Sequence, residues 1–362
     1  MLLVLFPYLT FKTLNFIYFT PHIPFMSTEK ISEGKANCYI YTASKISKEL
    51  PVFYNPVMKF NRDTSVLLLK CFERKFSICD PLAGTGIRGI RFLLELKNVE
   101  VDMNDISEES VKLIKKNLKL NKIKNLKIGN KDANVFLLES KGYDYIDIDP
   151  FGFPGNFLDA AVKRLGREGI LAVTATDTSA LSGTFPKACL RKYWALPKRD
   201  AIMHETGLRI LIRKVQLIGV SHNKALTPIF SYSKDHYMRV FFLCEKSKKA
   251  SDEIIKQHGM FNDSGPMWLG KLWNNEIVEK MYDNADVELK KFMKLIKEES
   301  KIEQLGFYHI HDICKKEGKI VPNYEILFKK IKAKKYQVSR THFDEVGIRS
   351  DVPYKELVRL LS

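Results

Sequence analysis

The sequence predicts an α/β fold with a mostly parallel, doubly wound sheet, and three observations support this prediction. Between Lys75 and Glu245, short apolar runs alternate with amphipathic runs of helical period, which is the pattern of strands joined by crossover helices. The last two apolar runs of this region are too close for a crossover helix, which indicates an antiparallel pair at a sheet edge. With 45% hydrophobic and 11% aromatic residues among 362, the chain can fill a packed core, so a disordered protein is excluded.

Short runs rich in β-branched or apolar residues are expected to form a seven-stranded sheet. They are Phe76–Asp80, Val99–Asp105, Leu126–Asn130, Tyr143–Asp149, Gly169–Thr176, Thr227–Ser233 and Tyr237–Cys244. Runs with an apolar period of 3.6 predict helices between them. These are Ser107–Leu120 with Ser107 as its N-cap, Phe157–Leu165 and His204–Ile218. In such a sheet, ligands bind at the carboxyl ends of the strands.

Composition changes along the chain predict three regions. Residues 1–25 are apolar and aromatic, but they lack a basic start and are interrupted by Lys12 and by prolines, so we expect neither a signal peptide nor a membrane span. The polar run that follows Met26 favours translation from that residue, with a weak interfacial anchor as the alternative. Residues 26–245 hold the predicted sheet, and residues 246–362, which are lysine-rich and mainly helical in pattern, form a second, smaller domain.

The charge balance indicates a polyanionic partner. With 59 Lys and Arg against 42 Asp and Glu, the net charge is +17, which favours nucleic acid or an anionic membrane surface, although adaptation for solubility gives the same balance. Five lysines between Lys329 and Lys335 form either a solvated helix face or a phosphate-binding surface. The six cysteines are scattered singly, so we expect a reducing compartment and no structural metal.

A glycine-rich turn after the first strand indicates a nucleoside-containing ligand. Gly84, Gly86 and Gly89 satisfy the pattern G-x-G-x-x-G, and N–H groups at the start of the next helix can approach a ligand closely. The pattern alone also fits a dinucleotide. Asp80 ends the strand, where it would repel a pyrophosphate but suits the ammonium group of S-adenosylmethionine (AdoMet). Arg88 could pair with a carboxylate.

Acids follow the next two strands as well. Asp105 is placed where a carboxylate can accept the ribose hydroxyls of a nucleoside, a requirement that NAD and AdoMet share. Asp132 and the N–H of Ala133 could bind the edge of an adenine. For Asp132 by itself, simple solvation or helix capping is an equally good explanation. Three acids at successive strand ends are harder to explain without a ligand.

The fourth strand ends in Asp149, Pro150 and Phe151, a group suited to an aromatic amine. Such an amine is a poor nucleophile because its lone pair is delocalised into the ring. A site that methylates it needs an acceptor for each N–H and a flat apolar surface for the base. The carboxylate of Asp149, the carbonyl of Pro150 and the ring of Phe151 supply these three groups.

Several stretches together resemble the tRNA guanosine-26 N2-dimethyltransferases, which are AdoMet-dependent class I methyltransferases. They are VFYNPVMKFNRD, DPLAGTGIRGIRF, DIDPFGFPGNFLDAAVKRLGREGILAVTATDTSALSG, HETGLRILIRKV and SRTHFDEVGIRSD. The resemblance extends from about Glu33 to the C-terminus. It implies a class I (Rossmann-like) fold with an antiparallel final strand and a helix-rich α+β C-terminal domain that helps to grip tRNA.

The resemblance also implies roles for individual residues. It makes Arg62 an AdoMet ligand, and the same site is completed by Arg88, Asp105, Asp132 and Ala133. It makes Asp149, Pro150 and Phe151 the pocket for the guanine amine and Phe53 a wall of it. Many relatives carry paired cysteines before the Gly-Pro-x-Trp-x-Gly stretch, whereas this chain has none there, so zinc is not expected.

The resulting hypothesis is a cytoplasmic tRNA methyltransferase that makes N2,N2-dimethylguanosine at position 26. The helix that begins at His204 is expected to be structural, with Arg209 or Arg213 facing RNA. No membrane partner is expected, and a monomer is the default because the sequence does not indicate an oligomeric state. The alternatives are an enzyme that methylates adenine N6 or another planar amine, and a non-catalytic RNA-binding protein.

Overall fold

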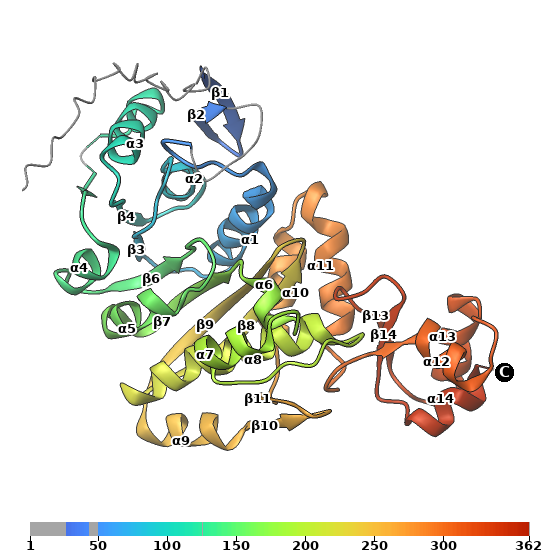
Figure 1. Ribbon diagram of the computed structural model, residues 1–362. Coiled ribbons are helices and arrows are strands. Elements are labelled where there is room, and N and C mark those ends of the chain that lie inside the picture. Colours follow the sequence, from blue (N-terminus) through green and yellow to red (C-terminus); the bar gives the residue numbers. More distant parts are fainter. Residues whose placement is uncertain (1–26, 43–49, 125, 362) are drawn as a thin grey trace, which may run out of the picture.

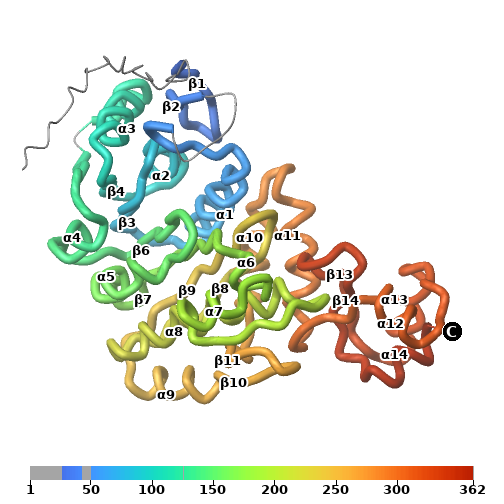
Figure 2. The backbone as a smooth tube through the Cα atoms, viewed as in Figure 1, coloured from blue at the N-terminus to red at the C-terminus, as the bar shows by residue number. Residues whose placement is uncertain are grey.

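The computed structural model describes residues 27–42, 50–124 and 126–361, and a seven-stranded sheet lies at the centre of this part of the chain (Figure 1; Figure 2). In sheet order the strands are β5 (Ile128–Gly129), β4 (Val99–Asn104), β3 (Phe76–Asp80), β6 (Tyr143–Ile148), β7 (Leu165–Ala175), β9 (Tyr237–Lys246) and β8 (Lys224–Lys234). The first five are parallel, whereas β9 is antiparallel to both β7 and β8. The predicted sheet with an antiparallel edge pair is confirmed.

Helices pack against the sheet in two groups (Figure 1). The helices up to β8 are α1 (Lys59–Lys70), α2 (Ile87–Glu95), α3 (Glu108–Leu120), α4 (Ala133–Leu138), α5 (Gly155–Arg164), α6 (Thr178–Leu181), α7 (Pro186–Tyr193) and α8 (Met203–Ser221), with a 3-10 turn at Pro56–Met58 before α1. One group includes α1, α2 and α3, in which α2 packs on both α1 and α3, and the other includes α4, α5 and α8, in which α5 packs on both α4 and α8. The three predicted helices are confirmed, and Ser107 caps α3 by accepting the N–H of Ser110 at 3.3 Å.

An N-terminal hairpin, which the sequence analysis did not predict, consists of β1 (Ser27–Glu33) and β2 (Ala36–Thr42). Most of β1 is polar and exposed, so it lacks the alternation that reveals a half-buried strand. Asn117 of α3 and Asn121, the C-cap of that helix, bind the backbone of β2. Asn117 accepts the N–H of Tyr39 at 2.7 Å, and Asn121 accepts the N–H of Asn37 at 2.9 Å.

The hydrophobic core continues beyond the predicted boundary at residue 245. The elements that follow are α9 (Lys248–Lys256), β10 (His258–Phe261), β11 (Ser264–Trp268), α10 (Asn275–Asn284) and α11 (Val287–Glu299). Their apolar side chains, among them Trp268 and Met281, belong to the same cluster as the central sheet. The predicted boundary therefore does not coincide with a break in the packing.

A second hydrophobic cluster lies in the last part of the chain, residues 308–361, which we call the C-terminal lobe. It contains β12 (Tyr308–His309), α12 (Ile310–Glu317), α13 (Tyr324–Ala333), β13 (Val338–Arg340), β14 (Gly347–Ser350) and α14 (Tyr354–Leu360). A small antiparallel sheet in the order β12-β14-β13 carries the helices, and the lobe projects from one end of the molecule (Figure 1). The lobe is a small helix-rich α+β unit, but it is shorter than the C-terminal domain predicted at residues 246–362.

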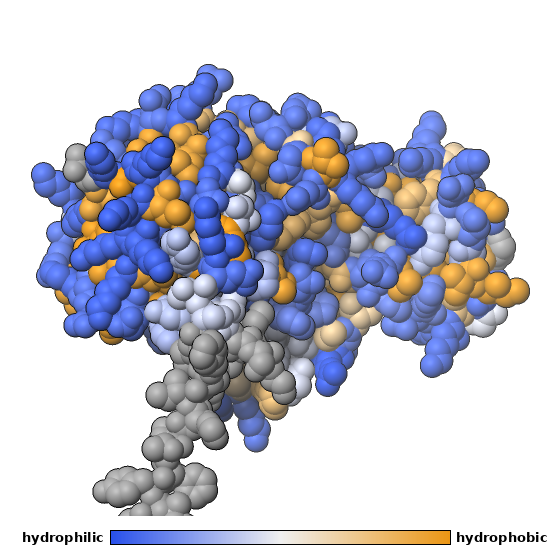
Figure 3. Space-filling model, turned by 90° about the horizontal axis from the view of Figure 1, so that it is seen from above, coloured by the Kyte–Doolittle hydropathy of each residue, from blue (hydrophilic) through white to orange (hydrophobic). Residues whose placement is uncertain are grey.

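The surface seen from above is mostly hydrophilic, with hydrophobic side chains between the polar ones (Figure 3). Within the described residues, no helix is long and apolar enough to cross a membrane, and no group of three or more potential ligands is arranged for a metal. All six cysteines are buried and free. The predictions about residues 1–25 and about Met26 lie outside the described residues.

Candidate functional site

The loop between β3 and α2 has the backbone shape that the glycine pattern predicts. Gly84 and Gly86 have φ angles of 54° and 77°, in the left-handed region that side chains with a Cβ rarely adopt. Gly86 is also the N-cap of α2, so the loop leads into the N-terminus of a helix. A Cβ at Gly84 would lie 3.4 Å from the carbonyl oxygen of Phe53. The loop thus brings Phe53 to the carboxyl edge of the sheet.

Asp105, which follows β4, fixes this loop. Its Oδ2 accepts the N–H of Gly84 at 2.8 Å and its Oδ1 accepts the N–H of Ser107 at 2.9 Å. Each carboxylate oxygen has a further lone pair, so these bonds orient the group without using all of its acceptors. The predicted contact with ribose hydroxyls stays a prediction.

Asp80 is buried at the end of β3 with one oxygen unsatisfied. The side chain is 2% exposed, and Oδ2 has no hydrogen-bond partner within the described residues. Burial, only partly offset by the charge of Arg88, raises the pKa of Asp80 to about 7. A buried carboxylate without a donor is costly, and the ammonium group of AdoMet would supply both a charge and donors. The residues at this strand end therefore fit AdoMet.

Asp132 and Ala133 stand at the start of α4. Asp132 Oδ1 accepts the N–H groups of Asn134 and Val135 at 2.9 and 3.3 Å, so the capping reading of this residue is confirmed. Ala133 is the buried first residue of the helix, and N–H groups of a first turn have no partner inside their own helix. Contact of either residue with an adenine stays a prediction.

The loop after β6 presents the side chains predicted for the amine pocket. Gly152 donates its N–H to Thr176 Oγ1 at 2.6 Å and accepts the N–H of Thr176 at 3.1 Å, which ties the loop to the end of β7. Phe151 is 54% exposed, and its ring meets the ring of Phe53 edge to face at 4.6 Å. Phe53 and Phe151 are 98 positions apart in the sequence, and the structure brings both to one wall of the site.

Arg88 reaches from α2 to Asp149. Its Nη2 forms an ion pair with Oδ2 of Asp149, and its Nη1 lies 3.2 Å from Oδ2 of Asp147. Nη1 also donates to Asn61 Oδ1 at 2.9 Å and Ser65 Oγ at 3.1 Å. Although burial opposes the charged form, these two carboxylates raise the pKa of Arg88. The guanidinium thus holds the predicted catalytic carboxylate, and its predicted role as an AdoMet ligand stays a prediction.

Arg62 is oriented away from this arrangement, toward the hairpin. Its Nε and Nη2 donate to the two carboxylate oxygens of Glu33 at 2.7 and 2.6 Å. Arg91 of α2 also pairs with Glu33, at 2.8 Å. Burial would raise the pKa of Glu33, but the two guanidinium groups lower it to about 2. The structure thus places Arg62 in a buried ionic cluster, and its role as an AdoMet ligand stays a prediction.

A buried ion pair that was not predicted from the sequence lies next to the site. Arg239 of β9 is 0% exposed and donates to both oxygens of Asp147 at 2.8 and 2.7 Å. Although burial raises the pKa of Asp147, Arg239 and Arg88 bring it below its ordinary value. A lone arginine inside the apolar run Tyr237–Cys244 was a readable signal, because a buried charge requires a partner.

The two arginines of α8 do not share the expected orientation. Arg209 is buried, pairs with Glu205 at 2.9 Å and donates to the carbonyl oxygens of Trp268 and Gly270, so the expectation that it faces RNA is wrong. Arg213 is half-buried and donates to the carbonyl of Trp194 at 3.4 Å. The physical reason is burial: α8 packs on the sheet and on β11.

Comparison with known proteins gives a consistent result. The sequence profile of the family described as "N2,N2-dimethylguanosine tRNA methyltransferase" matches residues 30–264 and 258–362. The chain is 37% identical over 376 aligned residues to the tRNA (guanine(26)-N(2)/guanine(27)-N(2))-dimethyltransferase of Aquifex aeolicus (strain VF5), with 91% of this chain and 95% of the relative covered. It is 35% identical to the tRNA (guanine(26)-N(2))-dimethyltransferase of Methanococcus maripaludis (strain C6 / ATCC BAA-1332), with 92% and 97% covered.

A solved structure shows the same fold. Trm1 from Pyrococcus horikoshii, determined in complex with S-adenosyl-L-methionine, aligns with a TM-score of 0.84 at 34% sequence identity. The alignment covers 92% of this chain and 99% of that one.

Proposed function

Because this chain belongs to the N2,N2-dimethylguanosine tRNA methyltransferase family, we propose that it transfers two methyl groups from AdoMet to N2 of guanosine 26 in tRNA at the carboxyl edge of its sheet. The observation that carries this site assignment is the position of Asp149. Its side chain is 16% exposed beside the exposed ring of Phe151, while Arg88 holds one of its oxygens from behind.

The donor side of the site is acidic and glycine-rich. AdoMet, when bound, supplies an electrophilic methyl group on a sulfonium. Asp80 would pair with its ammonium group, Asp105 would accept its ribose hydroxyls, and the loop through Gly84 and Gly86 lets the backbone approach it closely. Asp132, Ala133, Arg62 and Arg88 complete the proposed set of ligands.

On the acceptor side, the chain would orient the amine and receive its proton. Asp149 accepts one N–H of the guanine amine and the Pro150 carbonyl accepts the other, while Phe151 and Phe53 hold the base. Two acceptors draw the nitrogen toward a tetrahedral shape and direct its lone pair, so the rate gain comes from orientation and charge complementarity. As the new bond forms, the nitrogen becomes cationic and its proton passes to the Asp149 carboxylate.

The second transfer places a condition on the pocket. The first product keeps one N–H, so this hydrogen and the new methyl group must exchange places between the two acceptors. Phe151 is 54% exposed, and this open edge gives the monomethylated amine room to turn beside Asp149.

tRNA binding follows from the same assignment. We assign it in part to residues 246–362, where Lys329, Lys332, Lys334 and Lys335 are exposed on or next to α13. Neutralising phosphates releases counterions, so tRNA affinity should fall steeply with salt. We further infer a monomer that acts in the cytoplasm, where tRNA is modified.

The test is a nucleoside digest of tRNA treated with the full-length protein and AdoMet, analysed by mass spectrometry. We expect N2,N2-dimethylguanosine from tRNA with guanosine at position 26 and none from a matched tRNA with adenosine there. Methyladenosine instead would indicate the adenine-methylating alternative. No product together with tight tRNA binding would indicate a non-catalytic RNA-binding protein. Residual product from the adenosine-26 tRNA would place a target at another guanosine.

A further inference from the structure

The segment between α6 and α8, which includes α7, has a basic and aromatic surface that the proposed chemistry does not use. Residues 183–199 contain three lysines and two arginines but no aspartate or glutamate. Six of their exposed side chains define what we call the α7 ridge: Phe185, Lys187, Arg191, Trp194, Lys198 and Arg199. Because acids are absent from this segment, the charge of the ridge has one sign.

The α7 ridge adjoins the proposed amine pocket. Tyr193, at the end of α7, donates its hydroxyl to Asp177 at 2.6 Å, and Lys192 donates to the same carboxylate at 3.1 Å. The Tyr193 ring also meets the ring of Phe153 at 4.9 Å. Phe153 lies two positions after Phe151, so α7 is packed directly against the loop that carries the amine pocket.

The cations of the ridge are available to a partner. Lys187, Arg191 and Arg199 are exposed and form no ion pair within the part of the chain that the structure describes. Lys198 forms only a long ion pair, in which its Nζ lies 3.7 Å from Oδ2 of the exposed Asp263. Lys187 and Arg191 lie four positions apart on α7, so their unneutralised charges repel each other and a polyanion would relieve this repulsion.

Trp194 adds a stacking surface to these charges. Its ring is 55% exposed, whereas the other tryptophans, Trp268 and Trp273, are buried. It occupies the C-cap of α7 with a φ of 57°, where glycine is the usual residue because a side chain there is strained. Lys214 lies 3.2 Å from the centre of the ring and fixes its inner face. An exposed ring held in this way among cations is suited to stack on an unpaired base.

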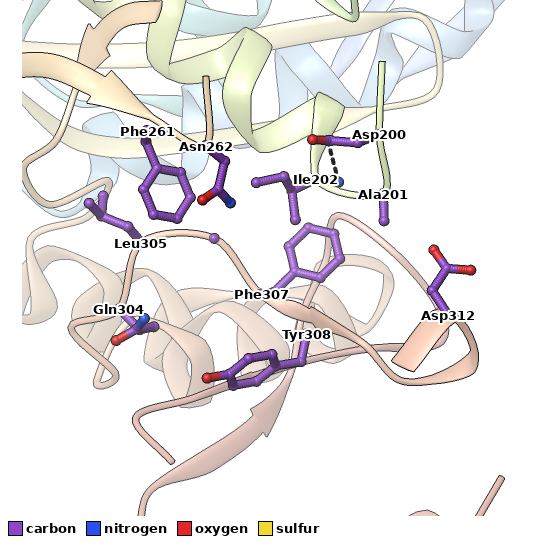
Figure 4. A pocket seen from close by; sticks show the side chains of 11 residues that line it. Asp200, Ala201, Ile202, Phe261, Asn262, Gln304, Leu305, Phe307, Tyr308 and Asp312 are labelled. Atoms are coloured by element: carbon purple, nitrogen blue, oxygen red, sulfur yellow. Dashed lines mark hydrogen bonds between the residues drawn. The ribbon is translucent and has the colours of Figure 1, made fainter. Parts of the chain in front are cut away.

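The ridge also lies on a path toward the C-terminal lobe. The segment that joins α7 to α8 runs along the molecule in that direction (Figure 1), and it ends at a cavity of about 370 Å³ between Asp200–Ile202 and Gln304–Tyr308. Ile202, Phe261 and Phe307 face one another across this cavity (Figure 4). A strand of RNA on the ridge could therefore extend from the pocket to the lobe that carries the lysine run.

We propose that the α7 ridge holds the tRNA strand next to the target guanosine, with Lys187, Arg191 and Arg199 on its phosphates and Trp194 against an unpaired base. This inference rests on the proposed function, because it assigns a second part of the same substrate to a surface of the sheet domain. Nucleic acid fits better than a protein partner, because the ridge combines one sign of charge with exposed flat rings.

The first test removes charge in matched pairs. Lys187→Ala/Arg191→Ala takes two cations, four positions apart, from the exposed face of α7. Lys115→Ala/Lys119→Ala takes two exposed cations with the same spacing from α3. With full-length protein, we expect the α7 pair to weaken tRNA binding about tenfold and to lower the slope of log affinity against log salt by about 1–2. We expect the α3 pair to change the affinity less than about twofold.

Two further measurements distinguish the ridge from the rest of the proposal. AdoMet affinity, measured by calorimetry, should be unchanged in the α7 pair, and the KM for tRNA should rise. Trp194→Ala should weaken tRNA binding about tenfold, whereas Trp194→Phe, which keeps a ring, should recover most of the loss. Because the other tryptophans are buried, tRNA should also quench a fluorescence signal that Trp194→Phe lacks.

Equal tRNA affinity and salt slope in the two double variants would overturn the ridge proposal. A change in self-association without a change in tRNA affinity would also overturn it, because the ridge would then bind a second copy. If the wild-type protein bound tRNA through the ridge but made no dimethylguanosine, the proposed function would be wrong. The proposal that the ridge binds tRNA would then still hold.

Discussion

Two ionic clusters both combine carboxylates with arginines but differ in how completely their carboxylates are paired. The catalytic cluster consists of Asp80, Arg88, Asp147, Asp149 and Arg239 at the carboxyl edge of the sheet. The junction cluster consists of Glu205, Arg209, Glu299, His342 and Arg349, where α8 and α11 meet the C-terminal lobe. The difference separates a cluster that stabilises the fold from the cluster at which we propose that the ligands bind.

In the junction cluster, every carboxylate oxygen has a donor. Arg349 of the lobe pairs with Glu205 at 2.6 Å and with Glu299 at 3.0 Å, Arg209 completes Glu205 at 2.9 Å, and His342 completes Glu299 at 2.7 Å. Burial would raise the pKa of Glu299, but His342 and Arg349 lower it to about 2. Both acids therefore stay ionised in the interior and fix the lobe to the sheet.

The catalytic cluster is incomplete by comparison. Asp80 keeps a buried oxygen without a donor and a pKa of about 7, and Asp149 is partly open to solvent. Only Asp147, between Arg88 and Arg239, is paired as fully as the junction acids. The unpaired oxygen of Asp80 and the open edge of Asp149 lie at the proposed donor and acceptor sides of the reaction. Carboxylate oxygens without hydrogen-bond donors therefore lie where we propose that the ligands bind.

The largest effect is expected from Asp149→Ala. Methyl transfer should fall about a thousandfold or more, because the amine loses its charged acceptor, while AdoMet affinity should stay within a few fold. Single-turnover dimethylguanosine formation and an AdoMet titration measure the two quantities. Turnover at the wild-type rate would remove Asp149 from the reaction, and an equally large loss of AdoMet affinity would make it part of the donor side.

A loss of stability is expected when the complete cluster is broken. Arg349→Met leaves Glu205 and Glu299 buried and partly unpaired, so the free energy of unfolding in urea should fall by about 3–5 kcal/mol. The loss should shrink at lower pH, because protonation neutralises the unpaired acids. Arg359→Met is the matched control: its arginine side chain is 79% exposed, and it should cost less than about 0.5 kcal/mol. Equal losses in the two variants would mean that the junction cluster contributes no special stability.

Substitution of Asp80 is expected to raise the free energy of unfolding, whereas Arg349→Met lowers it. Because burial raises its folded-state pKa to about 7, the native protein binds a proton there as pH falls, and its stability rises between about pH 8 and pH 4. Asp80→Asn should remove this rise and stabilise the unliganded protein at pH 8 by about 2 kcal/mol.

AdoMet binding gives the second half of this prediction. Only ionised Asp80 pairs with an ammonium group, so affinity should fall as pH drops below about 7, by up to about tenfold per pH unit. In Asp80→Asn the affinity should be about 10–100-fold lower and the pH dependence absent. A titration that keeps the wild-type pH dependence in this variant would place the titrating group elsewhere.

Much of the sheet was predictable because its strands are short apolar runs with an acid at the end. Asp80, Asp105 and Asp149 follow this rule, and the fold brings their strand ends to one edge. The two-residue strand β5 was predicted too long, at Leu126–Asn130 rather than Ile128–Gly129, because only its end pairs with β4.

The partners of the site were harder to predict from sequence. Glu33 lies in an exposed polar strand, and nothing local indicates that it meets Arg62 and Arg91. Arg239 was visible as an isolated charge in an apolar run, but its partner Asp147 lies 92 positions earlier. Local patterns reveal which side chains are unusual, whereas the pairing depends on the order of strands in the sheet.

The position of β9 determines when during synthesis the site can form. Its arginine is made last among the strands of the central sheet but pairs with an acid on a strand made much earlier, so Asp147 has only one of its two arginine partners until most of the sheet domain has left the ribosome. A nascent chain that ends before β9 therefore has no finished pocket. Completion of the proposed site thus depends on a contact between residues 92 positions apart, and such dependence on distant contacts predicts a slow folding step.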